Sequence, residues 1–164
     1  ALSDLLGSSR SRLKSLSMNN NFIPDDASIA LARSLVNNGT LTDLYLDNTG
    51  FATRGLQAFS DVLRSPASGL RNLSLRKNRV KNRGAILLAD CLRYNNTMRS
   101  LNLENDISIT TKGWKAFSRL LCRRSSIMDT YSSNHTLQKL IGDEYTLSGD
   151  LMLLLLMNRD GDER

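Results

Sequence analysis

Few residues in this sequence could support catalysis or hold a metal ion. The single histidine, His135, lies in a Ser-Ser-Asn-His-Thr stretch, and no G-x-S-x-G motif marks a serine nucleophile that it could activate. Zinc needs four Cys, His or carboxylate ligands at a recognisable spacing, whereas Cys91 and Cys122 show no C-x-x-C pattern. We therefore predict a surface or turn histidine, a buried Cys91 that packs as a small hydrophobic residue, and no disulfide.

Two short stretches resemble part of an ion or phosphate site, and each lacks a required residue. Asn158, Asp160 and Asp162 have the spacing of the first ligands of a calcium loop, but Glu163 replaces the glycine and no bidentate glutamate follows. The stretch 50–55 begins and ends with glycine but lacks the Lys-Ser/Thr of a phosphate-binding loop. The sequence thus predicts no catalytic residue, no metal site, no cofactor and no small-molecule substrate, which argues against an enzyme.

The leucines carry a stronger pattern than the reactive residues do. The form L-x-x-L-x-L occurs four times, with methionine replacing leucine twice, and its first residues are Leu13, Leu41, Leu70 and Met98. The spacings between these positions are 28, 29 and 28 residues. Three residues after each motif stands a polar residue that can bond to the backbone of a tight turn: Asn21, Thr49, Asn78 and Asp106. An ionised aspartate accepts but does not donate hydrogen bonds, so we expect a rearranged turn in the fourth repeat.

Each motif is followed by the pattern of an amphipathic helix. A small residue, suited to close helix-to-strand approach, stands 14 or 15 positions after the first motif residue, at Ala27, Gly55, Gly84 and Gly113. Apolar residues recur four and eight positions later, which places them on one helix face. One repeat cannot bury its strand and its helix alone, so the repeats must stack. The expected fold class is an α/β solenoid with parallel strands on a concave face and helices on a convex face.

These motifs, with their matching Asn/Thr, Gly and Leu columns, resemble the ribonuclease-inhibitor-like subfamily of leucine-rich repeat proteins over about residues 13–125. The resemblance implies a horseshoe-shaped domain that binds another protein. We interpret residues 1–164 as a single domain, with 1–12 as the tail of a preceding repeat, 13–125 as four repeats, and 126–164 as a degenerate repeat with a capping helix. In that last segment we expect a shortened strand and turn at 127–134, a further fragment at 137–140 and the capping helix at 151–158.

Composition agrees with a soluble binding domain. The longest apolar run, 151–157, is far shorter than the roughly 20 residues of a membrane span, and two cysteines favour a reducing compartment, so we predict a cytoplasmic protein without membrane association. The formal net charge is +6, but the basic residues are scattered singly or in pairs, which does not predict a nucleic-acid partner. Four Asn-x-Ser/Thr sequons occur, and they start at Asn38, Asn72, Asn95 and Asn134.

The concave face is the candidate binding surface. Because alternate side chains of a strand take opposite faces, we expect the residues one, four and six positions after each first leucine to project outward. These are Lys14, Thr42, Arg71 and Arg99; then Ser17, Tyr45, Ser74 and Asn102; then Asn19, Asp47, Arg76 and Glu104. Tyr and Arg are frequent in binding hot spots, which favours Tyr45, Arg71, Arg76 and Arg99 as the main contacts. The full predicted partner-binding set is Tyr45, Asp47, Arg71, Ser74, Arg76, Arg99, Asn102 and Glu104.

A protein-interaction module is the leading functional hypothesis, and three others stay open at this level. The Ran GTPase-activating protein is also similar to this repeat family, so activation of a small GTPase is one alternative. A structural or sensor segment of a larger receptor-like protein is the second, because the first repeat looks truncated. Nucleic-acid binding through the net positive charge is the third, and it would weaken steeply with salt.

Overall fold

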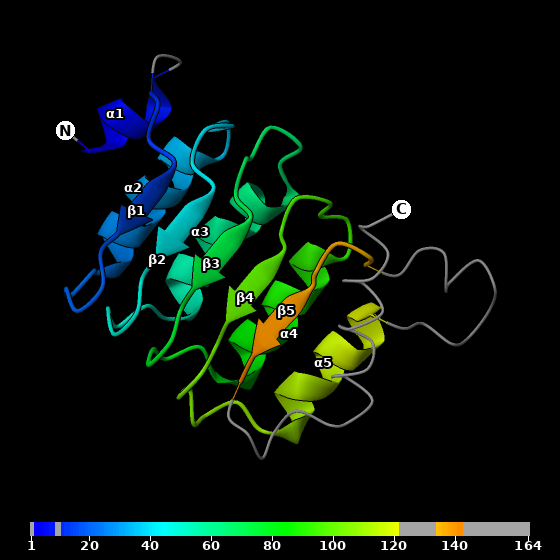
Figure 1. Cartoon of the computed structure of the whole chain (residues 1–164). Helices are drawn as coiled ribbons and strands as arrows, with labels where there is room; N and C mark the ends of the chain where they lie inside the picture. Colours follow the sequence, from blue (N-terminus) through cyan, green and yellow to red (C-terminus); the bar gives the residue numbers. More distant parts are fainter. Residues whose placement is uncertain (1, 9–10, 122–133, 143–164) are drawn as a thin grey trace.

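The computed structural model describes residues 2–8, 11–121 and 134–142 (Figure 1). Within these ranges helices and strands alternate along the chain, in an order that begins with a helix and ends with a strand. The elements are α1 (Leu2–Gly7), β1 (Ser15–Ser17), α2 (Asp25–Leu35), β2 (Asp43–Tyr45), α3 (Thr53–Arg64), β3 (Asn72–Ser74), α4 (Lys81–Leu92), β4 (Ser100–Asn102), α5 (Thr111–Leu121) and β5 (Lys139–Ile141).

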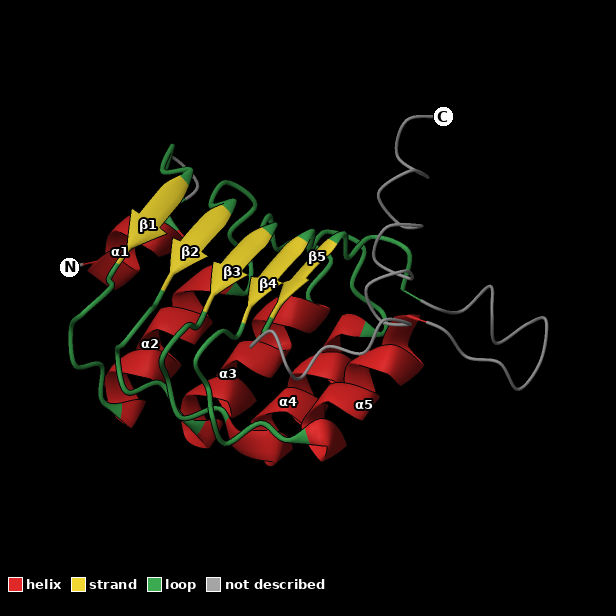
Figure 2. Cartoon of the chain, turned by 60° about the horizontal axis from the view of Figure 1, so that its bottom comes forward, coloured by secondary structure: helices red, strands yellow, loops and turns green. Residues whose placement is uncertain are grey.

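The strands form one parallel sheet in the order β1-β2-β3-β4-β5, so strands that follow one another in sequence pair in space. Their central residues align in one row, which consists of Leu16, Leu44, Leu73, Leu101 and Leu140. The helices cover one face of the sheet and leave the other face open, as Figure 2 shows. The parallel α/β arrangement predicted from the leucine repeat is thereby confirmed.

The motif leucines fill the space between the sheet and the helices. In the second repeat, Leu41, Leu44 and Leu46 are 1%, 0% and 0% exposed. Full burial of one such side chain contributes about 1.5–3 kcal/mol to folding. Because each strand has only three residues, the three buried leucines of a repeat contribute much of its stabilisation. The same layer contains Phe51 and Phe59, whose rings meet edge to face with centroids 5.2 Å apart.

The glycine column of the helices permits close packing between helices, which corrects the expected helix-to-strand approach. A Cβ on Gly84 in α4 would lie 2.6 Å from Cδ1 of Leu56 in α3 and 2.9 Å from Cγ1 of Val80. A Cβ on Gly113 in α5 would lie 2.8 Å from Oδ1 of Asn82 in α4. The small residue therefore sets the distance between the helices of consecutive repeats.

The turn after β3 is tied to the preceding repeat by Asn78. Its Nδ2 donates to the carbonyls of Leu75 (2.8 Å) and Leu46 (2.7 Å), and its Oδ1 accepts from the backbone N–H of Thr49 (3.0 Å) and Phe51 (2.9 Å). The polar turn residue thus supplies donor and acceptor bonds to groups that have no strand partner, as its position predicts.

Asp106 performs the acceptor half of the same role. Its Oδ1 accepts from the N–H of Val80 at 3.1 Å in the preceding repeat. An extra turn follows, in which the N–H of Ile109 donates to the Asp106 carbonyl at 2.8 Å. The expected rearrangement of the fourth turn is confirmed, and it accommodates the one additional residue before Gly113.

Three of the four sequons are structural asparagines that precede a strand. Asn95 shows the arrangement: its Nδ2 donates to the carbonyl of Leu63 at the end of α3 (2.7 Å), and its Oδ1 accepts from the N–H of Thr97 (3.0 Å) and Met98 (2.7 Å). Asn38 and Asn134 make the equivalent bonds to the carbonyls that end α1 and α4. These amides are buried and donate to backbone, so a glycan on them would break the loops between repeats.

The expected fragment at 137–140 provides β5, which pairs with β4. Asn134 ends the stretch in which a shortened strand and turn are expected, and the rest of that stretch lies outside the described residues, as does the expected capping helix at 151–158.

Candidate protein-binding surface

The open face of the sheet displays residues two and four positions after each first leucine. In β2 these are Asp43 and Tyr45, on either side of the buried Leu44. The position two residues after each first leucine forms the column Ser15, Asp43, Asn72, Ser100 and Lys139.

The predicted first column is therefore displaced by one residue. Its members directly precede the strands, at the edge where the strands begin, and they are Lys14, Thr42, Arg71 and Arg99. The physical reason is parity: positions one and four cannot share a face of a regular strand, whereas positions two, four and six can.

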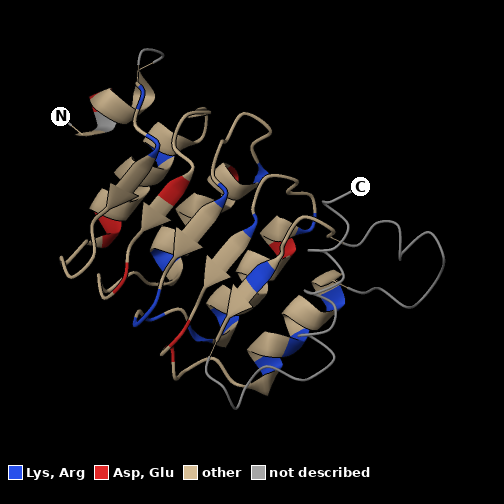
Figure 3. Ribbon diagram, viewed as in Figure 1, with Lys and Arg blue, Asp and Glu red and all other residues tan. Residues whose placement is uncertain are grey.

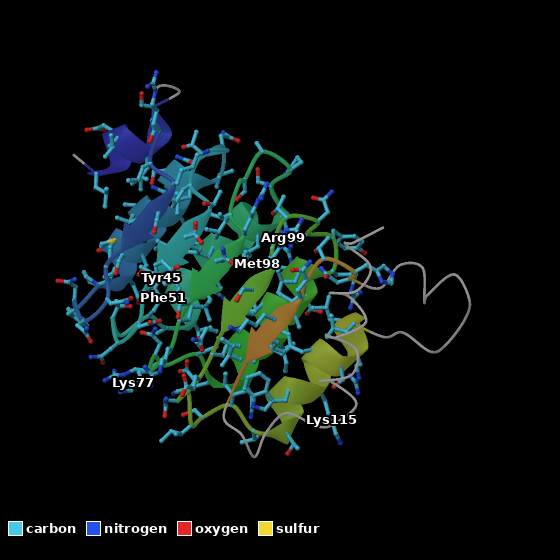
Figure 4. All side chains as sticks on the ribbon, viewed as in Figure 1. Tyr45, Phe51, Lys77, Met98, Arg99 and Lys115 are labelled. Carbon is cyan, nitrogen blue, oxygen red and sulfur yellow. The ribbon has the colours of Figure 1, made fainter. Side chains whose placement is uncertain are left out.

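Arg71 and Arg99 flank the open face at this edge. Their backbone belongs to the sheet, because the Arg71 carbonyl accepts from the N–H groups of Arg99 (2.8 Å) and Ser100 (3.0 Å). The Arg71 side chain is exposed and the Arg99 side chain is half-buried. Figure 4 places Arg99 at this edge and Tyr45 beside β2.

The open face is hollowed over β2 to β5. The hollow measures about 240 Å³ and is lined by Tyr45, Asn72, Leu73, Ser74, Ser100, Asn102, Lys139 and Ile141. Three predicted residues, Tyr45, Ser74 and Asn102, are thus brought together here.

Lys139 and Ile141 were missed because the fifth motif begins at Leu137, 39 residues after Met98, and so falls outside the 28-residue spacing. The signal that identifies this repeat is the triplet Asn-x-Thr before the first apolar residue, which precedes Leu41, Met98 and Leu137 alike.

Residues of the predicted second and third columns form a polar frame where the strands end. The Oδ1 of Asp47 accepts from the Ser74 hydroxyl and from the N–H of Arg76 (3.0 Å). Arg76 Nε lies 3.0 Å from Glu104 Oε2, and Asn102 Oδ1 accepts from the Glu104 N–H at 2.9 Å. The Asp47 and Ser74 side chains are thus hydrogen-bonded to each other, whereas Arg76 and Glu104 form an ion pair whose side chains are 41% and 38% exposed.

Neither a protein-family model nor a curated protein sequence matches this chain. Among solved structures, it is similar to the tropomodulin C-terminal domain of Caenorhabditis elegans, with a TM-score of 0.75 and 16% identity over 98% of this chain and 93% of that one. It is also similar to a structure described as leiomodin-1 actin-binding site 2, with a TM-score of 0.74 and 19% identity over 99% of this chain and 89% of that one. The chain shares the fold of these domains.

Outside the open face, the candidate reactive residues of the described ranges lie in different parts of the fold. His135 is exposed in the segment before β5, and Cys91 is 1% exposed in α4. In the described ranges, no three His, Cys, Asp or Glu residues are grouped so as to hold a metal ion. No helix in these same ranges is long and apolar enough to cross a membrane. Cys122 and the stretch 158–163 lie outside them.

Burial raises the pKa of the Cys91 thiol, because desolvation disfavours the thiolate. In a Cys122→Ser variant, where Cys91 is the remaining thiol, we expect iodoacetamide to react about two orders of magnitude more slowly than with a peptide cysteine. Denaturant should restore the peptide rate. Mass spectrometry of timed samples measures both rates, and rapid labelling of the native variant would contradict the packing of α4.

Proposed function

We propose that this chain is a non-catalytic module that binds a partner protein on the open face of its sheet. The observation that carries the proposal is the uncovered, largely polar face with its hollow over β2 to β5. Tyr45 lines this hollow and presents a large, stiff side chain with a polar end, the type that dominates binding hot spots.

The eight residues predicted from sequence have two roles in this proposal. Tyr45, Arg71 and Arg99 are the main contacts. Asp47, Ser74, Asn102 and Glu104 form a polar frame around them, and Arg76, also predicted as a main contact, belongs to this frame because it pairs with Glu104.

We further propose that the repeats curve as in ribonuclease-inhibitor-like proteins, and that residues 1–164 form one domain. Parallel strands lie about 4.8 Å apart, whereas packed helices need about 8–10 Å. Since each repeat contributes one strand and one helix, the helical layer is wider per repeat than the sheet. This supports a stack that bends toward the sheet and makes the open face concave.

Actin is the first partner to test, because the leiomodin-1 structure that shares this fold is described as an actin-binding site. Cosedimentation of the purified chain with filamentous actin, and crosslinking to monomeric actin, would reveal binding. If neither occurs, proteins crosslinked through a photoreactive residue at position 45 would identify another partner. If no protein is crosslinked there, the proposal fails.

Replacing Tyr45 by alanine should weaken partner binding roughly 10- to 100-fold, since a central aromatic contact typically carries about 2 kcal/mol or more. Tyr94→Ala is the matched control, because Tyr94 is 81% exposed and follows α4, away from the open face. Titration calorimetry measures both affinities, and circular dichroism checks that both variants fold. If Tyr45→Ala and Tyr94→Ala bind the partner with equal affinity, the open face is not the binding site.

A further inference from the structure

The positive charge of the chain is concentrated in one part of the fold. Residues 75–118 contain nine Lys and Arg against three Asp and Glu, an excess of six that equals the formal net charge of the whole chain. Figure 3 shows basic residues where β3 leads into α4 and at the start of α5, with an acidic stretch between them after β4. Of the nine cations in this segment, Arg76 and Arg93 pair with carboxylates and Arg99 lies directly before β4.

Six exposed cations form this basic edge: Lys77, Arg79, Lys81, Arg83, Lys112 and Lys115. None of the six pairs with a carboxylate among the described residues, where the ion pairs are Arg54 with Asp25, Arg76 with Glu104, and Arg93 with Asp90. Figure 4 places Lys77 and Lys115 toward the same side of the molecule.

Side-chain bonds hold the starts of α4 and α5 together, so the cations cannot move apart without breaking them. Asn82 Oδ1 accepts from the N–H groups of Thr110 (2.8 Å) and Gly113 (3.1 Å), and the Asn82 Nδ2 donates to the Thr110 hydroxyl (3.0 Å). Lys81 and Arg83 flank Asn82, and Lys112 precedes Gly113.

The basic edge opposes the local requirements of the fold. Helix N-termini favour acidic residues, and α2 follows this rule with Asp25 and Asp26. The first turns of α3, α4 and α5 hold no acid, and those of α4 and α5 carry cations that have no ion pair in the described ranges. Lys77 also adopts φ 55°, in a position where three other repeats have asparagine, the residue that accepts this conformation readily. Residues that do not suit their local backbone positions are typical of binding sites, where function rather than stability determines the residue type. The cations of the basic edge follow this pattern.

The chemistry of this edge favours an acidic protein segment over single-stranded nucleic acid or insertion into a lipid surface. Single-stranded nucleic acid is typically held by aromatic side chains that stack on its bases, and the exposed aromatic residues of the described ranges, Phe22 and Tyr94, lie outside the basic edge. Membrane surfaces require an apolar helix face, whereas this region exposes one large apolar side chain, Ile107, at 88%. The Ile107 loop lies against the start of α4 through Asp106 and Val80.

We infer that the basic edge is a second binding surface, distinct from the open face, for an acidic protein segment that carries an aliphatic residue. Carboxylates of that segment pair with the cations at the starts of α4 and α5, and its aliphatic side chain covers Ile107. The inference does not depend on what the open face binds.

The test uses a fluorescent synthetic peptide of repeated Glu-Glu-Leu units and measures its anisotropy with the full chain. The Arg83→Glu/Lys112→Glu variant should weaken binding at least about tenfold, while Arg12→Glu/Arg33→Glu, with the same change of net charge at two exposed sites elsewhere, should bind like the parent protein. Affinity of the parent protein should fall as salt increases. Ile107→Ser should weaken binding of the Glu-Glu-Leu peptide but leave binding of a peptide made of glutamate alone unchanged.

Thermal stability distinguishes a binding role of the basic-edge cations from a structural role. The Arg83→Glu/Lys112→Glu variant places acids at two helix N-termini, so its thermal midpoint should stay level or rise while peptide binding falls. Tyr45→Ala should leave peptide binding unchanged, which separates this surface from the proposed open-face site. Equal binding by the two double variants overturns the inference. So does tighter binding of single-stranded DNA, or of vesicles containing phosphatidylserine, than of the acidic peptide.

Discussion

Gly69→Ala is expected to lower the free energy of unfolding by about 3 kcal/mol, the upper range for overpacking a close contact. A Cβ on Gly69 would lie 2.4 Å from the carbonyl oxygen and 2.7 Å from the carbonyl carbon of Gly39. Both are backbone atoms, so no side-chain rotation can relieve the overlap. The loops are also bonded here, since the Gly69 N–H donates to the Asn38 carbonyl at 2.9 Å.

Gly39→Ala is the matched control, because it adds the same methyl group to the other glycine of this pair, where the methyl group does not point at Gly69. Its nearest neighbour would be the Ala67 carbonyl oxygen at 3.4 Å, an ordinary contact distance, so a change within about 1 kcal/mol is expected. Neither glycine has a positive φ, so backbone strain does not confuse the comparison. Urea unfolding followed by circular dichroism measures both variants. Equal losses would show that the loops before β2 and β3 are not packed in this way.

Asn95→Ala should also destabilise the fold by about 3 kcal/mol. The Asn95 side chain is 8% exposed and satisfies the Leu63 carbonyl at the end of α3 together with the N–H of Met98 at the entry to β4. Removing it leaves a buried donor and a buried acceptor unpaired, and each costs about 1–3 kcal/mol. A helix C-terminus carries such orphan carbonyls, so the loss should appear first as fraying of α3.

Asn96→Ala provides the control for this prediction. Asn96 is the next residue and is exposed, so its truncation should change stability by less than about 0.5 kcal/mol. Urea unfolding gives the two free energies, and hydrogen exchange at the end of α3 tests the location. If Asn95→Ala proves as mild as Asn96→Ala, the bridging role assigned to Asn38, Asn95 and Asn134 is wrong.

The leucine spacing predicted the parallel strands and their helices because burial in a stacked repeat imposes a strict period. Leu44 and Leu73 occupy equivalent, fully packed places, so the same residue type must return in each repeat. The fifth repeat was predicted only as a fragment of a degenerate repeat, because its first leucine follows Met98 by 39 residues instead of 28 or 29. Its asparagine triplet keeps the pattern of the second and fourth repeats, because one buried amide there bonds three backbone groups.

Sequence by itself determined the repeat, the layer that each leucine joins and the polar character of the open face, since these follow from periodic burial along one chain. Only the tertiary structure decided which polar residues share that face, because a displacement of one residue reverses the side of a strand to which a side chain points. It also decided that cations up to 38 residues apart, from Lys77 to Lys115, lie along one edge. Stacking brings equivalent positions of consecutive repeats together, and charge acts through distance in space rather than along the chain.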